Sequence, residues 1–369
     1  KLERLVQQLV DISREDWDNF ERSWNFKTLP LLNQFPKEKS LQESFVRFTD
    51  DSSKLVQTSQ RIESELNELI IEAYIVDEFC ASEVPDEMVT LTCNSIYRYG
   101  GSSVENKLRE QSDTVSELIS FGLGCMMGRY SLDRKRLVYA NSCNEGFKEL
   151  VAEGAFQTFP ADDDGIVPLA SEDWLFDDDA TTRFKEFVKT VWGDDTLDEN
   201  LEFVAESLCL HALKPVKGES ANDSVRRYFS KQFYKDHCKT YKKRPIYWLF
   251  SSGKEKAFEC LVYLHRYNEG TLSRMRTEYV TPLMGKYEAQ HTLLSEQQLQ
   301  ATGTEARRIE KDLKSLEKKQ AELRTFDEQL KHYAEKRITL DLDEGVKENY
   351  GKFGNLLADV KAIHGKAVK

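Results

Sequence analysis

Basic residues recur along one stretch of the chain at a spacing that suits the binding of an anionic ligand. The stretch carries two series of side chains, each with a step of four residues and two residues out of phase with the other. The basic series is Arg227, Lys231, Lys235 and Lys239, and the aromatic series is Phe229, Phe233, His237 and Tyr241. Two residues correspond to about 200° of helical rotation, so the two series are expected on opposite faces of one helix. One face can then pack into a core while the other meets phosphate groups.

The residues that follow extend the positive charge and then end the predicted helix. Lys242, Lys243 and Arg244 are basic, and Pro245 lacks the N–H that a further helical turn requires. From Asp223 to Arg244 there are eight Lys or Arg and two Asp, a local charge of eight minus two, +6, in a chain whose net charge is −12. A solvated amphipathic helix is the ordinary interpretation of such a pattern taken alone. The continuous basic face and the aromatic segment beyond it favour a helix that contacts phosphates.

Two further segments carry basic or aromatic residues that could contact a nucleic acid. The smaller basic cluster, ahead of a predicted short strand at 137–139, consists of Arg129, Arg134, Lys135 and Arg136. Residues 94–101 predict a turn rich in Tyr, Arg and Gly, in which Tyr97 and Arg98 could touch a nucleic-acid backbone, although the same residues equally suit a plain surface loop. With the basic series and the three cations after it, these are the candidate DNA-binding residues.

The negative charge of the chain is concentrated in residues 161–206. This acidic segment holds fifteen Asp or Glu and three Lys or Arg, a balance of −12 that equals the net charge of the whole chain. Apolar residues at 184, 187, 188, 191 and 192 predict one helix within it, with the acids at its ends and in the adjoining loops. The default interpretation is a solvated surface. A docking face for a basic partner, or for the chain's own basic helix when DNA is absent, stays open as an alternative.

No motif in the sequence points to catalysis or to a metal ion. The seven cysteines form no Cys-x-x-Cys pair and the six histidines no His-x-x-x-His, so neither a disulfide framework nor a zinc site is expected, and the cytoplasm is the expected compartment. Ser120 to Gly124 invite comparison with the F-x-G-x-G loop that binds S-adenosylmethionine, but helical spacing before them favours close helix packing. No apolar run of about 18 residues predicts a membrane span.

The elements that must position these residues predict a mixed α/β fold that is predominantly α-helical. A chain of 369 residues with 40% hydrophobic content can bury more than one core, so two or three domains are expected. Residues 1–78 predict two packed helices with Trp17 and Trp24 as core anchors. Residues 79–270 predict an α/β domain, which includes a strand at 88–92, a helix at 103–127 and a β-hairpin after Pro245.

Residues 271–369 predict an antiparallel helical hairpin followed by a tail. The two helices are expected at 272–300 and 305–336, and Thr302 and Glu305 between them have the spacing of a capping box. The second helix carries a heptad seam made of Ile309, Leu313, Leu316, Leu323 and Leu330. This hairpin is expected to be a scaffold element.

Six separated strings of the sequence together resemble one protein family. They are NELIIEAY (67–74), TLTCNSIYRYGG (90–101), ISFGLGCMMGRYSLD (119–133), KTYKKRPIYWLFSS (239–252), YLHRYN (263–268) and LDLDEGVKENYGKF (340–353). In order and spacing they are similar to the C-terminal half of the adenine-specific DNA methyltransferases of BREX phage-defence systems, the PglX family. The resemblance spans nearly the whole chain.

The resemblance implies a parent enzyme that transfers a methyl group from S-adenosylmethionine to adenine N6 in double-stranded DNA. Catalysis would reside upstream, in an Asn-Pro-Pro-Tyr-type motif. The eight prolines of this chain are never adjacent, so the motif is absent, and the chain alone is expected to be inactive and to bind neither the cofactor nor a metal.

The resemblance also assigns roles to the predicted domains. Residues 1–78 become a connector after the catalytic domain, 79–270 a target-recognition domain that binds DNA, and 271–369 the scaffold. A docking module for other BREX proteins or phage-encoded inhibitors is the alternative. No membrane partner is expected.

Overall fold

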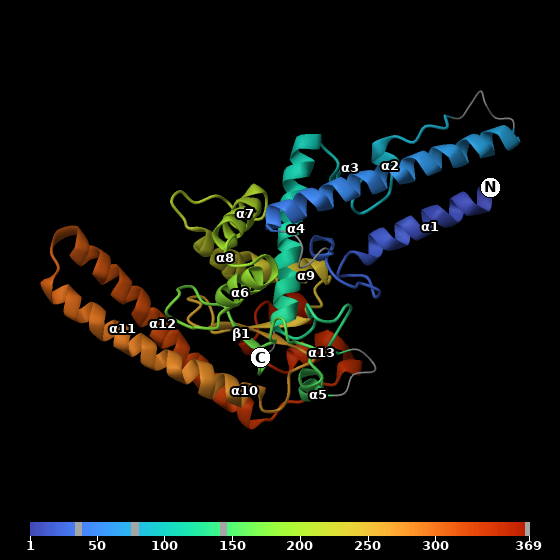
Figure 1. Ribbon diagram of the computed structural model, residues 1–369. Coiled ribbons are helices and arrows are strands. Elements are labelled where there is room, and N and C mark those ends of the chain that lie inside the picture. Colours follow the sequence, from blue (N-terminus) through green and yellow to red (C-terminus); the bar gives the residue numbers. More distant parts are fainter. Residues whose placement is uncertain (34–38, 75–80, 141–145, 366–369) are drawn as a thin grey trace. The chain divides into compact units, whose positions relative to one another are not determined.

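The computed structural model describes residues 1–33, 39–74, 81–140 and 146–365, and helices dominate it (Figure 1). A three-stranded antiparallel sheet is added to them, which confirms the predicted mixed, mostly helical fold. The chain forms two compact units, each built from several segments. Unit 1 comprises Lys1–Gly122, Tyr130–Asn141 and Phe184–Tyr228, and unit 2 comprises Leu123–Arg129, Ser142–Arg183 and Phe229–Lys369. These units cut across the predicted boundaries at 78/79 and 270/271, so the division into three functional domains stays a prediction.

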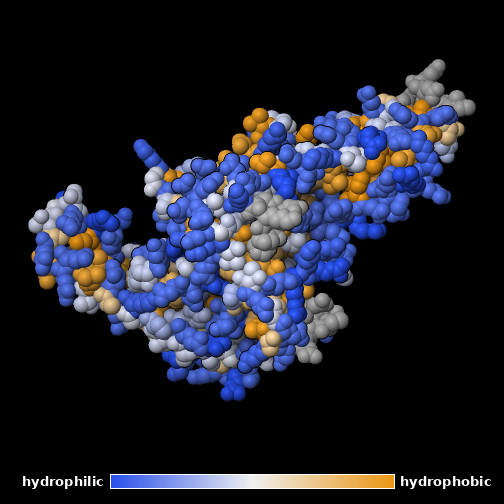
Figure 2. Space-filling view, in the orientation of Figure 1, coloured by the Kyte–Doolittle hydropathy of each residue, from blue (hydrophilic) through white to orange (hydrophobic). Residues whose placement is uncertain are grey.

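Unit 1 begins with the expected pair of long helices. Helix α1 (Leu2–Asp18) packs on α2 (Leu41–Tyr74), and the short 3-10 helix η1 (Pro30–Leu32) also contacts α2. Leu2, Val6 and Val10 of α1 are exposed, and Figure 2 shows hydrophobic patches among hydrophilic side chains on the surface of this helix pair.

The predicted burial of two tryptophans in unit 1 is wrong. Trp17 is 44% exposed and Trp24 is 101% exposed. The core positions next to them are taken instead by Phe20 and Phe26, which are 8% and 4% exposed. An apolar stripe shows which residues could pack but not which of them a tertiary neighbour covers, so the two tryptophans were misplaced.

No strand forms among the described residues of unit 1, where two short strands were predicted. Residues 89–92 and 137–139 belong to no helix or strand. The first of these segments lies between the 3-10 helix η2 (Asp86–Met88) and α3 (Ser95–Tyr99), and α3 replaces much of the turn predicted at 94–101. Helix α3 forms because the Asn94 side chain accepts a hydrogen bond from the backbone N–H of Ile96 at 3.2 Å, which caps its start. The remaining helices are α4 (Ser103–Met126), α6 (Ala180–Trp192), α7 (Leu197–Leu210) and α8 (Ala221–Tyr228), of which α4 and α6 continue into unit 2.

The glycines compared with a cofactor loop lie inside α4, as the helical spacing predicts. A Cβ atom on Gly122 would stand 3.3 Å from ring carbons of Phe184 and Phe187. Glycine therefore permits close approach of α4 and α6 at this point. No loop exists there to cradle a cofactor.

Unit 2 contains the sheet and its predicted hairpin. Strand β2 (Tyr247–Ser251) pairs antiparallel with β3 (Glu259–Tyr263), with Trp248 opposite Val262. Strand β1 (Ile166–Pro168), which was not predicted, pairs with the other edge of β3. Nearly every residue of the three strands is buried, so both faces of the sheet are covered and it forms the centre of the core.

The helical hairpin of unit 2 also forms as predicted. Its first arm comprises α10 (Thr271–Arg274), the π-helical segment η4 (Met275–Val280) and α11 (Thr281–Gln300), and its second arm is α12 (Gly303–Glu335). The heptad-seam leucines and Ile309 are buried. Thr302 makes no side-chain hydrogen bond to α12, so the predicted capping box does not form.

One carboxylate joins this hairpin to the sheet. Glu322 of α12 accepts hydrogen bonds from the Ser252 hydroxyl and the Glu255 backbone N–H, both at 2.7 Å. Both partners lie in the turn of the β-hairpin, between β2 and β3. Helix α12 therefore fixes the conformation of this β-hairpin turn.

Short elements complete unit 2. Helix α5 (Phe147–Ala152) belongs to unit 2, as do η5 (Leu342–Glu344), α13 (Gly345–Gly351), η6 (Gly354–Leu356) and α14 (Val360–His364). Tyr350 of α13 and Phe353, which precedes η6, pack against β2, where their rings lie 5.3 and 5.6 Å from that of Trp248. Among the helices that the structure describes, none combines the length and the apolar character needed to cross a membrane.

Candidate nucleic-acid interface

The basic stretch folds as three successive helical segments rather than one. Helix α8 is followed by the π-helical segment η3 (Phe229–Phe233) and by α9 (Tyr234–Thr240), and three turn residues then lead to Arg244. The π-helical turn is wider than an α-helical turn but does not end the helix. The aromatic and the basic face therefore both continue from η3 into α9. Such π segments often mark functional sites.

The aromatic face of this stretch is buried as predicted. Phe229 and Phe233 are each 2% exposed and His237 is 4% exposed. The Phe233 ring stacks on the His237 ring at 5.9 Å, and the His237 ring stacks in turn on Tyr247 of β2 at 4.8 Å. These contacts anchor η3 and α9 against the sheet.

Three exposed lysines on η3 and α9 and three exposed cations directly after α9 form what we call the basic strip. They are Lys231, Lys235, Lys239, Lys242, Lys243 and Arg244. Within the part of the chain that the structure describes, none of the six makes an ion pair. Their charges are therefore not neutralised by carboxylates of the fold and can attract an external anion.

Arg227, the first member of the predicted basic series, does not belong to the basic strip. Its guanidinium donates two hydrogen bonds to the Glu219 carboxylate, at 2.7 and 2.6 Å, and its side chain is only 15% exposed. The hydrogen bonds that Arg227 donates to Glu219 raise the pKa of Arg227. The four-residue spacing placed Arg227 in the basic series. That spacing could not predict its ion pair with Glu219, because Glu219 lies before the helix.

The C-terminal part of the basic strip is held in a tight turn. Lys242 and Lys243 both have left-handed backbone conformations, with φ of 50° and 61°. The Lys243 N–H donates to the Cys238 carbonyl at 2.7 Å and the Arg244 N–H to the Tyr241 carbonyl at 2.9 Å. Left-handed residues with a Cβ atom are unfavourable and persist where neighbouring contacts impose them. Three consecutive cations are thus displayed by a defined backbone.

His237 fixes the far end of this turn. Its Nε2 accepts hydrogen bonds from the backbone N–H groups of Ile246 and Tyr247, at 3.0 and 3.1 Å. Two donors at Nε2 require that this nitrogen carries no hydrogen, so the imidazole is neutral. Burial, and to a lesser degree the nearby charge of Arg129, lowers the pKa of His237 to about 3.

The second basic cluster is divided between the two units. Arg129 belongs to unit 2, and Arg134, Lys135 and Arg136 belong to unit 1. Lys135 and Arg136 are exposed, Arg134 is half-buried, and the Arg136 backbone N–H donates to the Lys27 carbonyl at 2.7 Å.

The two candidates at 94–101 differ in their availability to a ligand. Tyr97 is 49% exposed. Arg98 donates to the Glu117 carboxylate at 2.9 Å, and its guanidinium lies 5.2 Å from the ring centroids of both Phe20 and Tyr99. These contacts engage the Arg98 guanidinium within unit 1. Arg98 is therefore poorly placed to make the predicted contact with phosphate, whereas Tyr97 stays a candidate.

Two acids of segment 161–206 stabilise local structure. The Asp162 carboxylate accepts from the backbone N–H groups of Asp164 and Gly165, at 3.0 and 2.7 Å, and Asp179 accepts from the Thr182 N–H at 2.9 Å near the start of α6. Burial raises the pKa of the Asp164 carboxyl to about 7. Across the described residues, no group of three or more His, Cys, Asp or Glu is arranged to hold a metal ion.

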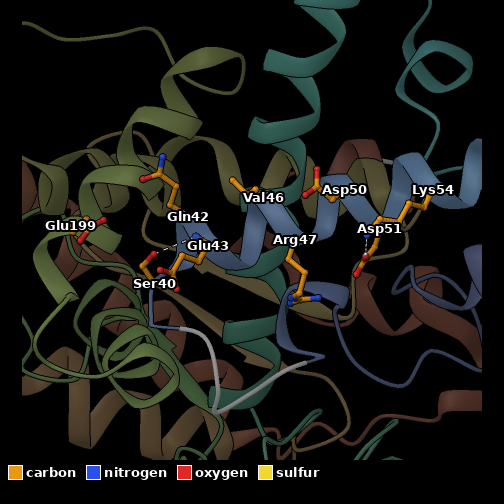
Figure 3. Close-up of a pocket in the computed structure, with 9 residues that line it drawn as sticks. All are labelled: Ser40, Gln42, Glu43, Val46, Arg47, Asp50, Asp51, Lys54 and Glu199. Carbon is orange, nitrogen blue, oxygen red and sulfur yellow. Dashed lines mark hydrogen bonds and ion pairs between the residues drawn. The ribbon is translucent and has the colours of Figure 1, made fainter.

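An open groove of about 560 Å³ lies beside the first half of α2 (Figure 3). Its charged lining consists of Glu43, Asp50, Asp51 and Glu199 against Arg47 and Lys54, which gives four minus two, a balance of −2. The Arg47 guanidinium donates to the carbonyls of Pro30 and Leu31, at 3.2 and 3.0 Å. An acidic groove with this engaged arginine does not suit a phosphate ligand.

Comparison with known proteins relates the chain to two methyltransferases. No protein-family profile matches it. It is 55% identical over 368 residues to the adenine-specific methyltransferase BrxX of Escherichia coli O9:H4 (strain HS), which is 99% of this chain and 30% of BrxX. It is 33% identical over 355 residues to the adenine-specific methyltransferase PglX of Lacticaseibacillus casei (strain Zhang), which is 94% of this chain and 27% of PglX. The chain therefore belongs to the family of BrxX and PglX, as a segment that spans less than a third of the length of either relative.

Proposed function

We propose that this chain is the C-terminal, DNA-binding and target-recognition part of an adenine-specific DNA methyltransferase of a BREX defence system. The basic strip is the observation that carries the proposal. Six exposed cations without carboxylate partners in the described fold lie between Lys231 and Arg244, although the net charge of the chain is −12. The names of the two relatives supply the reaction, and the basic strip supplies a surface for its anionic substrate.

The chemistry of the strip suits the DNA backbone better than the base edges. Five of its six members are lysines, whose ammonium groups act as point charges on flexible stems. Such groups bind phosphates of any sequence and thereby fix the position of the protein along the duplex. The bases would be read by other side chains.

The methyl donor fits poorly to this chain. Catalysis by the parent enzyme would use S-adenosylmethionine, but the glycines that resemble a cofactor loop are inside α4, and Gly122 is closed off by Phe184 and Phe187. We therefore assign the cofactor and the methyl transfer to the part of the enzyme outside this chain. The role of the present residues is to hold DNA.

The proposal is tested by the salt dependence of duplex binding, measured by fluorescence anisotropy. Log affinity falls linearly as log salt concentration rises. Each phosphate contact that is lost should reduce the magnitude of this slope, which we call the salt slope, by about 0.9. The variant Lys231→Ala, Lys235→Ala and Lys239→Ala should therefore lower the slope by about 2.7, by the same amount for any duplex sequence.

A matched control removes three lysines from another exposed face of unit 2. Lys311→Ala, Lys318→Ala and Lys331→Ala on α12 change the net charge equally, and this variant should keep the parental slope. If the strip variant also keeps the parental slope, the strip is only a solvated surface. The docking of other defence proteins or phage inhibitors would then be the better account of the chain.

A further inference from the structure

The loop between α1 and η1 displays a tryptophan completely to solvent. Trp24 is 101% exposed, whereas the neighbouring Phe20 and Phe26 are buried. Tryptophan carries the largest apolar surface of any side chain and is highly buried on average. An indole that the fold leaves bare is therefore a candidate for contact with a ligand.

The loop that carries Trp24 is firmly held. The Ser23 N–H donates to the Phe20 carbonyl at 2.8 Å and the Phe26 N–H donates to the Ser23 carbonyl at 3.2 Å, so two consecutive turns flank the tryptophan. The Phe26 ring lies 5.4 Å from that of Tyr130 and anchors the loop in the core of unit 1. Trp24 is thus presented by an ordered backbone, which lowers the entropy lost on binding.

The surroundings of Trp24 on unit 1 are basic. Arg22 is exposed, with its guanidinium 5.4 Å from the Trp17 ring centroid. Lys27 is exposed, and its carbonyl accepts the N–H of Arg136, which brings the exposed Lys135 and Arg136 to the same loop. We call these residues the aromatic–basic patch: Arg22, Trp24, Lys27, Lys135 and Arg136.

Two acids close to Trp24 in the sequence are engaged by hydroxyl groups of unit 1. The Glu21 carboxylate accepts from the hydroxyls of Ser120 and Tyr130, at 2.9 and 3.3 Å, and Asp18 accepts from the Ser23 hydroxyl. The ligand that fits is consequently anionic and offers a flat π face. Nucleic acid combines both properties, because phosphates meet the cations and a base stacks on the indole.

We propose that Trp24 stacks on a DNA base at a break in the base stack while the cations of the aromatic–basic patch hold the flanking phosphates. This inference rests on the proposed DNA-binding function. An enzyme that modifies a base takes that base out of the helix and leaves an opening in the stack. A rigid aromatic side chain beside a cationic surface can fill such an opening.

The test compares two duplexes of one sequence, one intact and one with a single abasic site that opens the stack. The wild-type chain should bind the abasic duplex more tightly than the intact one. Trp24→Ala should weaken binding to the abasic duplex by about 5- to 150-fold, because stacking on an aromatic side chain contributes that much per base. Its salt slope should not change, since tryptophan carries no charge.

Three further variants sharpen the test. Trp24→Phe keeps an aromatic ring and should retain most of the preference for the abasic duplex, whereas Trp24→Leu should lose it. Lys135→Ala with Arg136→Ala should lower the salt slope by about 1.8 and keep the preference. Because all three positions are exposed, the variants should melt within a few degrees of the wild type.

The outcomes separate this inference from the proposed function. If the wild type shows no salt-dependent binding to either duplex, the proposed function fails and the inference falls with it. If the wild type binds DNA and Trp24→Ala binds the abasic duplex as tightly as the wild type does, the function stands and base stacking is wrong. Retention of the preference by Trp24→Leu would also overturn stacking and favour an apolar side chain inserted as a wedge into the opening.

Discussion

The basic strip and the acidic segment 161–206 have opposite charges and opposite structural uses. Asp162 and Asp179 accept hydrogen bonds from nearby backbone N–H groups and hold turns and a helix start. Lys235 and Lys239 extend from a helix face whose backbone is already satisfied. A carboxylate on a short stem is a natural acceptor for its own backbone, whereas a long ammonium side chain finds no such local role. In this chain, acids such as Asp162 and Asp179 can therefore stabilise the fold. Exposed lysines such as Lys235 and Lys239 instead remain available to a ligand.

The largest effect should come from the aromatic face beneath the basic strip. If the strip is only displayed by the fold, the residues under it must supply the folding energy. Phe233→Ala should lower the free energy of unfolding by about 3–5 kcal/mol, because a fully buried ring is lost and a cavity remains. Lys235→Ala, two residues away on the exposed face, should change it by less than about 0.5 kcal/mol. Urea denaturation measures both, and equal effects would contradict the division into two faces.

The next effect concerns pH and the histidine that fixes the turn of the strip. The pKa of His237 falls from its ordinary value near 6.5 to about 3 in the folded chain. The unfolded chain therefore binds the proton first, so stability is complete above about pH 6.5 and is lost as the pH falls towards 3. Between pH 6.5 and pH 5 this group should cost about 2 kcal/mol.

Variants of two histidines isolate this contribution. His237→Gln retains an acceptor for the two N–H groups and should lose about 2 kcal/mol less than the wild type over that pH interval. His211→Gln changes an exposed histidine and should lose as much stability as the wild type. Parallel stability curves for His237→Gln and the wild type would show that His237 is not the titrating group.

A smaller effect should separate two acids of the same segment. Asp179 accepts hydrogen bonds from the N–H and the hydroxyl of Thr182 at 2.9 and 2.7 Å. Asp179→Ala should therefore cost about 0.5–2 kcal/mol, as the loss of a helix cap does. Asp177→Ala, two residues earlier at an exposed position, should be nearly neutral in thermal denaturation. Equal costs would mean that the acids are simply a solvated run of charge.

The smallest effect should come from the turn of the basic strip. Lys242→Gly with Lys243→Gly relieves two left-handed residues and should raise the stability by at most about 1 kcal/mol. The same change should lower the salt slope of DNA binding by about 1.8. Lys239→Gly, within α9, is the control and should instead cost about 1 kcal/mol. A net loss of stability in the double variant would show that the two lysine side chains hold the turn.

Periodicity predicted the elements of this chain better than their surroundings. The helix expected at 103–127 runs from Ser103 to Met126, and the arms of the helical hairpin begin and end within two residues of the expected positions. Long amphipathic runs carry this signal because every turn repeats it. Strand β1 has only three residues within an acidic stretch, which is too short to show a period, and its partner is almost 100 residues away in the sequence.

The candidate site was predicted in part for the same reason. The spacing of lysines indicated the exposed face of α9, and that face is exposed. It could not indicate that Arg227 forms an ion pair with Glu219, or Arg98 with Glu117. The spacing of residues along one helix carries no information about partners outside that helix. Residue spacing also could not indicate that Trp24 is exposed to solvent, since an apolar residue at this position suits either a core or a ligand contact.

The salt slope of duplex binding tests the central comparison most directly when both charged regions are changed. One variant removes Lys231, Lys235 and Lys239 as above, and the other neutralises exposed acids through Asp177→Asn, Asp195→Asn and Glu202→Gln. We expect a slope smaller by about 2.7 for the first variant and an unchanged slope for the second. An unchanged slope for the first variant would mean that the basic strip makes no contact with DNA.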